Sequence, residues 1–137
     1  MLDQVEIFHG LSREELAALE ASSSSENYPK NTVVIQENEP ADALYVIESG
    51  RVKVYCSDKN GKEFIMNSLG VGDYFGELAL LDDSARSASV RTVEPCQFRI
   101  VKKEDFSKVL TDNPGITQQL LGNLAARVRK LTTDVKN

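Results

Sequence analysis

The sequence predicts an α+β fold: an antiparallel, jelly-roll-like β-roll with a helix before it and helices after it. Between about residues 30 and 101, short β-branched or alternating segments are separated by glycine, proline and asparagine turn signals, as in β-sandwiches and barrels. At both ends of the chain, apolar residues recur at helical spacing. With 137 residues and no internal repeat, we expect a single domain over 1–137. The β-roll is expected at about 30–101 and the last helix at about 114–135.

The composition excludes several classes of protein. Hydrophobic residues make up 41% and charged residues 27% of the chain, as in soluble globular proteins. The net charge of −5 argues against a nucleic-acid surface, which would be basic. No apolar run approaches the roughly 20 residues of a membrane span, and the first ten residues do not resemble a signal peptide. We therefore expect a cytoplasmic protein without membrane contact.

The first helix is indicated by a capping box, in which Ser12 caps the helix and Glu15 reaches back to it. This helix is expected to continue to about Ala21. The four serines at 22–25 are too few to separate two domains, and we interpret them as a surface turn.

The β-roll is predicted from six strand-like segments. They are residues 32–35, 43–47, 51–56, 63–69, 87–93 and 96–101. A turn is expected at 29–31, and Asn60-Gly61 predicts a tight hairpin between the third and fourth segments. In the third segment the alternation places Val52, Val54 and Cys56 inward and Arg51, Lys53 and Tyr55 outward. Two cysteines are too few for a disulfide scaffold, so Cys56 and Cys96 are expected to be small buried hydrophobic residues.

Two helices are predicted after the strands. Apolar residues at helical spacing indicate one over 102–110, and Pro114 stands at the start of the next. The last helix carries a heptad seam of Leu121, Leu124, Val128, Leu131 and Val135. About two heptads are too short to be stable alone, so this helix must dock. It packs on its own barrel, pairs with a second copy in a homodimer, or does both on different faces.

The residues with chemical potential are concentrated at 70–90. Gly76 opens a short helix, whose first N–H groups have no partner within it and favour an anion. Arg86 follows among small residues and supplies a planar cation suited to phosphate oxygens. Glu77 is unsuited to phosphate but can accept a hydrogen bond from a sugar hydroxyl. Together these residues predict a nucleotide pocket.

The segment GDYFGELALL followed by ARSASV resembles the phosphate-binding cassette of the cyclic-nucleotide-binding domain. That family includes catabolite-activator transcription factors, regulatory subunits of cAMP-dependent kinase and nucleotide-gated channels, and LYVIESGRVKVY resembles its preceding hairpin. The resemblance implies that Glu77 binds the ribose 2′-hydroxyl and that Arg86 binds the cyclic phosphate. It further implies that the backbone amides of Gly76 and Ala79, and those near Ser87 and Ala88, complete the binding cradle. The predicted ligand-binding set is Gly76, Glu77, Leu78, Ala79, Arg86, Ser87 and Ala88.

The family also implies that the last helix covers the base, and the lid candidates are Arg127, Leu131 and Thr132. We expect cAMP as the ligand, with cGMP as an alternative because Ser87, directly after the arginine, occurs with either base. The family usually has proline where this chain has Ala85, which leaves the loop less fixed. Asp82 and Asp83 are expected to face water.

Other interpretations remain open at this stage. Glu77 and Arg86 could form a structural bridge, Arg86 could be an ordinary surface residue, and Arg127 a solvated charge. A cupin-like metal enzyme would need a histidine cluster, whereas this chain has one histidine, His9. We expect no enzyme activity, no metal and no cofactor. No DNA-binding motif is apparent, and an interaction module that no longer binds nucleotide is the remaining alternative.

Overall fold

The computed structural model describes residues 2–82 and 84–136, with side chains other than those of Leu78, Asp82, Val135 and Lys136. The prediction that Asp82 and Asp83 face water lies outside this description. The helical elements are η1 (Leu2–Gln4), η2 (Glu6–Phe8), α1 (Arg13–Ser22), α2 (Glu77–Asp82), α3 (Lys103–Asp112) and α4 (Pro114–Lys136). The strands are β1 (Ser24–Tyr28), β2 (Val33–Ile35), β3 (Ala43–Ser49), β4 (Val52–Ser57), β5 (Glu63–Leu69), β6 (Tyr74–Phe75), β7 (Ser89–Thr92) and β8 (Cys96–Lys102).

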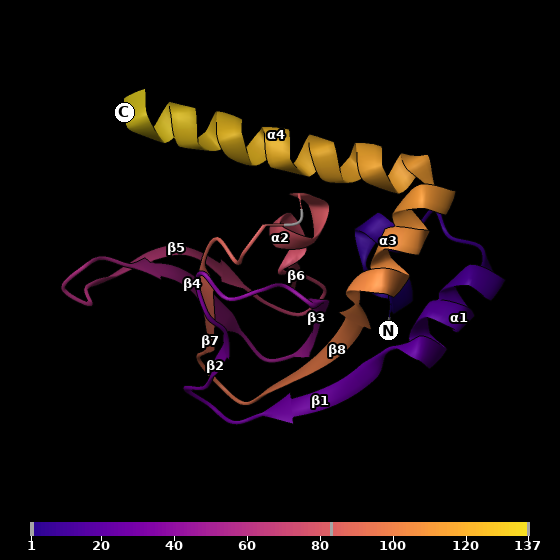
Figure 1. The fold of residues 1–137 in the computed structure, drawn as a ribbon, viewed down its shortest axis with the longest axis horizontal. Coiled ribbons are helices and arrows are strands. Elements are labelled where there is room, and N and C mark those ends of the chain that lie inside the picture. Colours follow the sequence, from indigo (N-terminus) through magenta and orange to yellow (C-terminus); the bar gives the residue numbers. More distant parts are fainter. Residues whose placement is uncertain (1, 83, 137) are drawn as a thin grey trace.

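The strands form two four-stranded antiparallel sheets, in the orders β1-β8-β3-β6 and β2-β7-β4-β5. Helices α1, α3 and α4 lie outside the sheets, and α4 passes over α2 (Figure 1). The predicted α+β fold, a jelly-roll-like β-roll with helices at both ends, is therefore confirmed. Asn60-Gly61 forms the predicted turn between β4 and β5, and Gly61 has a φ of +81°.

The core consists of two apolar clusters. One lies between the sheets and includes Ile47, Phe75 and Phe98. The other joins the N-terminal turns, β3 and β8 to the helices, where Phe106 of α3 is fully buried. The second cluster fixes the start of α4 against the roll, which positions the rest of that helix.

The N-terminal region agrees with the sequence in one element and differs in the next. The capping box of α1 is present, because Ser12 Oγ accepts from the Glu15 amide at 3.1 Å and Glu15 Oε1 accepts from the Ser12 amide at 3.1 Å. The predicted surface turn at 22–25 is wrong, since Ser24 begins β1, which pairs with β8 along its length. This strand is mostly exposed and polar, so it shows no apolar alternation. Its backbone pairing with β8 fixes its conformation.

The predicted exposure of Tyr55 is also wrong, because only 3% of this residue is accessible. The guanidinium of Arg91 lies 4.7 Å from the centre of the Tyr55 ring and donates to its hydroxyl at 3.1 Å. Arg91 in turn pairs with Glu63 at 2.7 Å. Charged side chains therefore cover the Tyr55 ring. The alternation of polar and apolar residues along a strand does not predict this arrangement. Of the two cysteines, Cys96 is buried as expected and Cys56 is only half-buried.

Helix α4 presents different faces to the domain and to its surroundings. Ile116 and Leu120 are almost completely buried against the roll. The heptad seam is largely uncovered, with Leu121, Val128 and Leu131 each about 60% exposed. Leu124 is half-buried. The helix therefore docks on its own domain through one face and leaves the apolar seam available on another.

Candidate functional site

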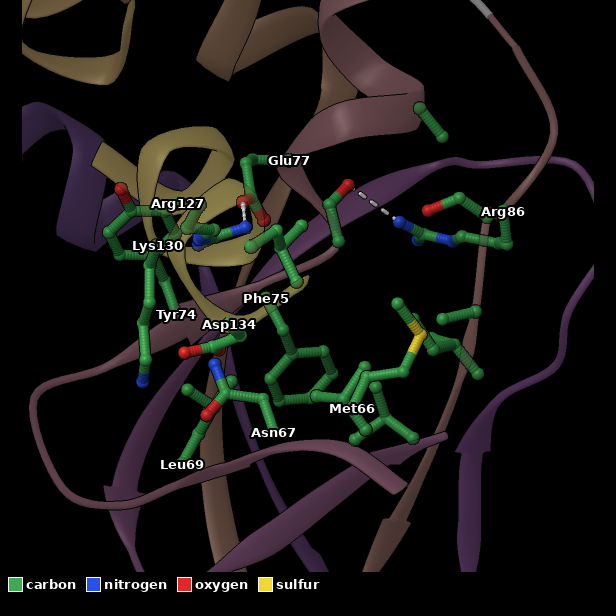
Figure 2. Close-up of a pocket in the computed structure, with 18 residues that line it drawn as sticks. Met66, Asn67, Leu69, Tyr74, Phe75, Glu77, Arg86, Arg127, Lys130 and Asp134 are labelled. Carbon is green, nitrogen blue, oxygen red and sulfur yellow. Dashed lines mark hydrogen bonds and ion pairs between the residues drawn. The ribbon is translucent and has the colours of Figure 1, made fainter. Parts of the chain in front are cut away.

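A cavity of about 270 Å³ lies between the β-roll, helix α2 and helix α4 (Figure 2). Its lining brings together cassette residues and side chains of α4, such as Glu77 and Arg127, which are 50 positions apart in the chain. Much of its surface is apolar. The apolar lining from the strands consists of Ile35, Val54, Met66, Leu69, Phe75 and Val90.

Helix α2 enters the cavity wall through a glycine, as the sequence predicts. Gly76 has a φ of +90°, a conformation that side-chain-bearing residues rarely adopt. A Cβ at this position would lie 2.5 Å from Arg86 Nη1, so a larger residue would also displace the arginine head group. Glu77 and Ala79 follow, and both are buried and line the cavity. Leu78 belongs to α2, but its side chain is outside the described residues.

Arg86 is buried with only 3% of its surface exposed, and its side chain is held by backbone oxygens. Nη1 donates to the Gly76 carbonyl at 2.7 Å and Nη2 donates to the Ala43 carbonyl at 2.9 Å. Asp42 lies 3.7 Å away and is well exposed, so solvent weakens this ion pair. Burial lowers the pKa of Arg86 from its ordinary value, and nearby Tyr45, Asp42 and Glu77 oppose that shift. Arg86 is therefore a fixed cation at the cavity wall.

Tyr45 fixes the other side of this cation. The Arg86 guanidinium carbon lies 5.9 Å from the Tyr45 ring centre, and the Tyr45 ring stacks on Phe75 at 5.1 Å. Burial is the main cause that raises the pKa of Tyr45 to about 12. The phenol therefore stays neutral at physiological pH, and the aromatic pair supports the arginine without adding charge.

Glu77 approaches the cavity from the opposite side (Figure 2). Its carboxylate pairs with Arg127 of α4, with 3.1 Å between Oε1 and Nη1. The Glu77 side chain is 6% exposed and the Arg127 side chain 45% exposed. Glu77 is thus paired with the last helix, while the hydrogen bonds of Arg86 go to main-chain carbonyls. Ser87 and Ala88, the remaining predicted ligand contacts, also line the cavity.

Two of the three lid candidates line the cavity. Arg127 and Leu131 line the cavity, but Thr132 does not, and its hydroxyl donates to the Val128 carbonyl at 3.0 Å. Successive residues of an α-helix are rotated by about 100° around its axis. Thr132, the residue after Leu131, therefore points away from the cavity. Lys130 and Asp134 line it instead. Lys130 lies three residues after Arg127 and Asp134 lies seven residues after it. Residues at these spacings share one face of a helix, so the sequence could have indicated both.

No local motif in the sequence predicts that β5 forms a wall of the cavity. Met66, Asn67 and Leu69 contribute to the lining, although these residues are recognisable from the sequence only as part of a strand. The pairing of β5 with β4 places them beside Val54. Such a wall depends on the register of two strands and on the position of α4, which local motifs do not specify.

Within residues 2–82 and 84–136, no three His, Cys, Asp or Glu side chains converge as ligands for a metal ion. Among the described helices, none combines the length and apolar character required to cross a bilayer.

The family comparison identifies the domain type. The model of the cyclic nucleotide-binding domain matches residues 25–113, which include the cassette and most of the β-roll. The match covers well over half of the chain and contains Glu77 and Arg86.

Known relatives and structures agree with this match. A CRP-like cAMP-activated global transcriptional regulator of Mycobacterium tuberculosis is 31% identical over 135 residues, which are 98% of this chain and 60% of the relative. The catabolite activator protein of Thermus thermophilus has a TM-score of 0.82 at 30% identity, over 95% of this chain and 61% of that one. The sensor domain of the transcriptional regulator DNR from Pseudomonas aeruginosa has a TM-score of 0.84 at 28% identity, over 99% of this chain and 91% of that one. This chain thus spans about three fifths of the length of the mycobacterial relative.

Proposed function

This chain belongs to the cyclic nucleotide-binding domain family, and on that premise we propose that its cavity is the receptor site for a cyclic nucleotide, most simply cAMP. The observation that carries the proposal is the presence of Glu77 and Arg86, both buried, in the lining of one cavity. Burying a charged side chain costs free energy unless the charge is paired or binds a ligand. A cavity lined by a buried carboxylate and a buried guanidinium therefore suits a polar ligand.

The phosphate is assigned to the neighbourhood of Arg86. Its guanidinium is already fixed by two carbonyls and by Tyr45, so little conformational freedom is lost on binding an anion. Ser87, Ala88 and the start of α2 lie around the same part of the cavity. In the proposed complex, these groups hold the phosphate through the arginine and the backbone amides near it.

The ribose is assigned to Glu77. One carboxylate oxygen is occupied by Arg127, but a carboxylate offers about four acceptor positions. A ribose hydroxyl can therefore donate to Glu77 without displacing Arg127. The base then lies against the apolar wall that includes Met66 and Leu69, with Leu131 of α4 on the other side.

Two observations keep cGMP as a second candidate. Asp134 contributes a carboxylate to the lining where α4 overhangs the cavity, and Ser87 supplies a hydroxyl beside Arg86. The Watson–Crick edge of guanine has two adjacent N–H donors that suit one carboxylate, whereas the same edge of adenine has one donor and one acceptor. We place cAMP first because the mycobacterial relative is a cAMP-activated regulator.

The proposed activity is regulation without catalysis. Ligand bound between the cassette and α4 favours the arrangement in which the helix covers the cavity, and the size of the switch is set by the difference in affinity between the two states. The uncovered seam of α4 is assigned to a homodimer, since Leu121, Val128 and Leu131 are exposed at heptad spacing. We further propose that the domain acts in the cytoplasm.

Parallel calorimetric titrations of this chain with cAMP, cGMP and 5′-AMP test the proposal. We expect saturable binding of one cyclic nucleotide per chain, tighter for cAMP than for cGMP, and much weaker binding of 5′-AMP. Tighter cGMP binding would reverse the choice of base. Absence of heat and of thermal stabilisation with both cyclic nucleotides would instead support the interaction module without a nucleotide.

A further inference from the structure

A hydrogen bond joins the strand that leads into the cassette to the helix above it. Asn123 Nδ2 of α4 lies 3.1 Å from the hydroxyl oxygen of Tyr74 in β6 and donates to it. Tyr74 is half-buried, lines the cavity and precedes Glu77 by three residues. Asn123 precedes Arg127 by four residues, or about one helical turn. The contact therefore lies one turn before the Glu77–Arg127 ion pair.

The position of this bond along α4 is informative. Ile116 and Leu120, in the first two turns, are buried against the roll. From Arg127 onward the helix is exposed on most sides and overhangs the cavity. Asn123 lies between these two parts, on the same face as Leu120 and Arg127. The bond thus marks the last polar attachment before the overhanging segment and its ion pair.

The chemistry of Tyr74 suits a neutral hydrogen bond with Asn123. Burial is the main cause that raises the pKa of Tyr74 above its ordinary value. The hydroxyl therefore remains un-ionised at physiological pH, and it can accept from Asn123 while keeping its own proton. The aromatic ring lines the cavity independently of the hydroxyl, so the two roles of the residue can be separated by removing a single oxygen.

We propose that Tyr74 is a positioning residue for α4, and that its bond with Asn123 holds the helix where Arg127 and Leu131 cover the cavity. This inference rests on the proposed function, because it assigns the control of ligand retention in the same site. A contact made only in the covered arrangement raises ligand affinity by raising the fraction of molecules in that arrangement. Its effect should appear mainly in the rate of ligand release, since the helix must move for the ligand to leave.

The test is a double-mutant cycle of Tyr74→Phe and Asn123→Ala, read by cAMP calorimetry and by stopped-flow release of a fluorescent cAMP analogue. One net hydrogen bond corresponds to roughly a 2- to 12-fold change in affinity. We expect each single variant to bind cAMP about 3- to 10-fold more weakly, through faster release. The double variant should bind no more weakly than the weaker single variant, because both changes remove the same contact.

Two variants serve as matched controls. Tyr28→Phe removes a hydroxyl whose contact is Glu26 within β1, at the opposite edge of the sheet from β6. Gln118→Ala removes an exposed amide from the same helix. Both should bind and release the ligand as the parent does. A Tyr74→Phe variant with parental affinity, or a double variant with strictly additive losses, would overturn the inference.

Hydrogen–deuterium exchange without ligand separates this inference from the proposed function. Tyr74→Phe should accelerate amide exchange in α4 beyond residue 123 and leave the exchange of β3 and β8 unchanged. Unchanged exchange in α4 contradicts the positioning role whether or not the parent binds nucleotide. Failure of the parent to bind any cyclic nucleotide, with accelerated exchange in the variant, overturns the proposed function and leaves the attachment of α4 supported.

Discussion

Oε1 of Glu77 and Nη1 of Arg127 lie 3.1 Å apart, so the buried acceptor of the cassette is tied directly to the last helix. The pair is asymmetric, because the Glu77 side chain is 6% exposed and that of Arg127 is 45% exposed. If the pair separates, the arginine can be hydrated, whereas the glutamate stays buried and loses its charged partner. The Glu77–Arg127 ion pair therefore couples the position of α4 to the contacts that Glu77 makes in the cavity.

Removal of the arginine should weaken the binding of cAMP. We expect Arg127→Gln to lower affinity about 3- to 10-fold, as for one lost charge-assisted contact. The free energy of unfolding should fall by about 1–3 kcal/mol, because the buried Glu77 carboxylate loses its charged partner. Calorimetry and thermal denaturation measure the two effects. Arg129→Gln, an exposed position on the same helix, is the control. Equal or tighter binding by Arg127→Gln would disprove the coupling.

Substitution of Gly76 should damage the site through the backbone. Gly76→Ala would place a methyl group 2.5 Å from Arg86 Nη1 at a φ of +90°. We therefore expect loss of detectable cAMP binding and a lower melting temperature. Gly122→Ala is the matched control, since a Cβ there meets nothing within 4 Å. It should leave binding intact and stabilise α4 by up to about 1 kcal/mol. Parental binding by Gly76→Ala is the contradictory result.

Asp134 should influence the choice of base. If its carboxylate accepts from a purine edge, Asp134→Ala should weaken cGMP binding about 5- to 10-fold and change cAMP binding by less than about twofold. The ratio of the two dissociation constants, measured in parallel titrations, is the readout. Asp112→Ala, outside the cavity lining, serves as the control. An unchanged ratio would remove Asp134 from the recognition of the base.

The exposed seam of α4 predicts self-association. Leu121→Glu and Val128→Glu place charges on residues that are about 60% exposed, so neither should unfold the domain. Sedimentation velocity should show a dimer for the parent and a monomer for either variant. Ala126→Glu, exposed on another face of the helix, should remain dimeric. A monomeric parent at all accessible concentrations would contradict the dimer.

Tyr45 predicts a loss of stability at high pH. Its pKa is raised to about 12 in the folded protein, mainly by burial, from an ordinary value of 10.0. Ionisation is easier in the unfolded chain, so this contribution is complete below about pH 10 and is lost progressively between pH 10 and 12. Tyr45→Phe should reduce the slope of stability against pH in that interval. Denaturant titrations across it measure the effect, and an unchanged slope is the opposing outcome.

Much of the fold and cassette could be predicted because the signals are local. The capping box of Ser12 and Glu15, the turn at Gly61 and the entry to α2 at Gly76 each depend on a few neighbouring residues. Gly76 needs a positive φ, and Arg86 donates to the carbonyl of that glycine ten residues earlier. Such requirements leave a trace in the sequence itself.

The errors arose where contacts between distant segments decide the structure. The polar residues of β1 form a strand because β8 pairs with them. Tyr55 is covered by Arg91 from a strand that follows it by more than thirty residues. The cavity wall of β5 likewise depends on sheet register, and Thr132 turns away because the axis of α4 is set by Ile116 and Leu120. None of these arrangements follows from local spacing.

The most direct test of the nucleotide site is the titration of cAMP into the parent and into Arg86→Leu, with circular dichroism to establish that both are folded. The parent should bind one cAMP per chain, and the loss of the guanidinium should cost about 2–5 kcal/mol of binding free energy. Arg86→Lys should restore only part of the affinity, because a lysine cannot form the planar fork. A folded Arg86→Leu variant that binds cAMP as tightly as the parent would contradict the assignment of the site.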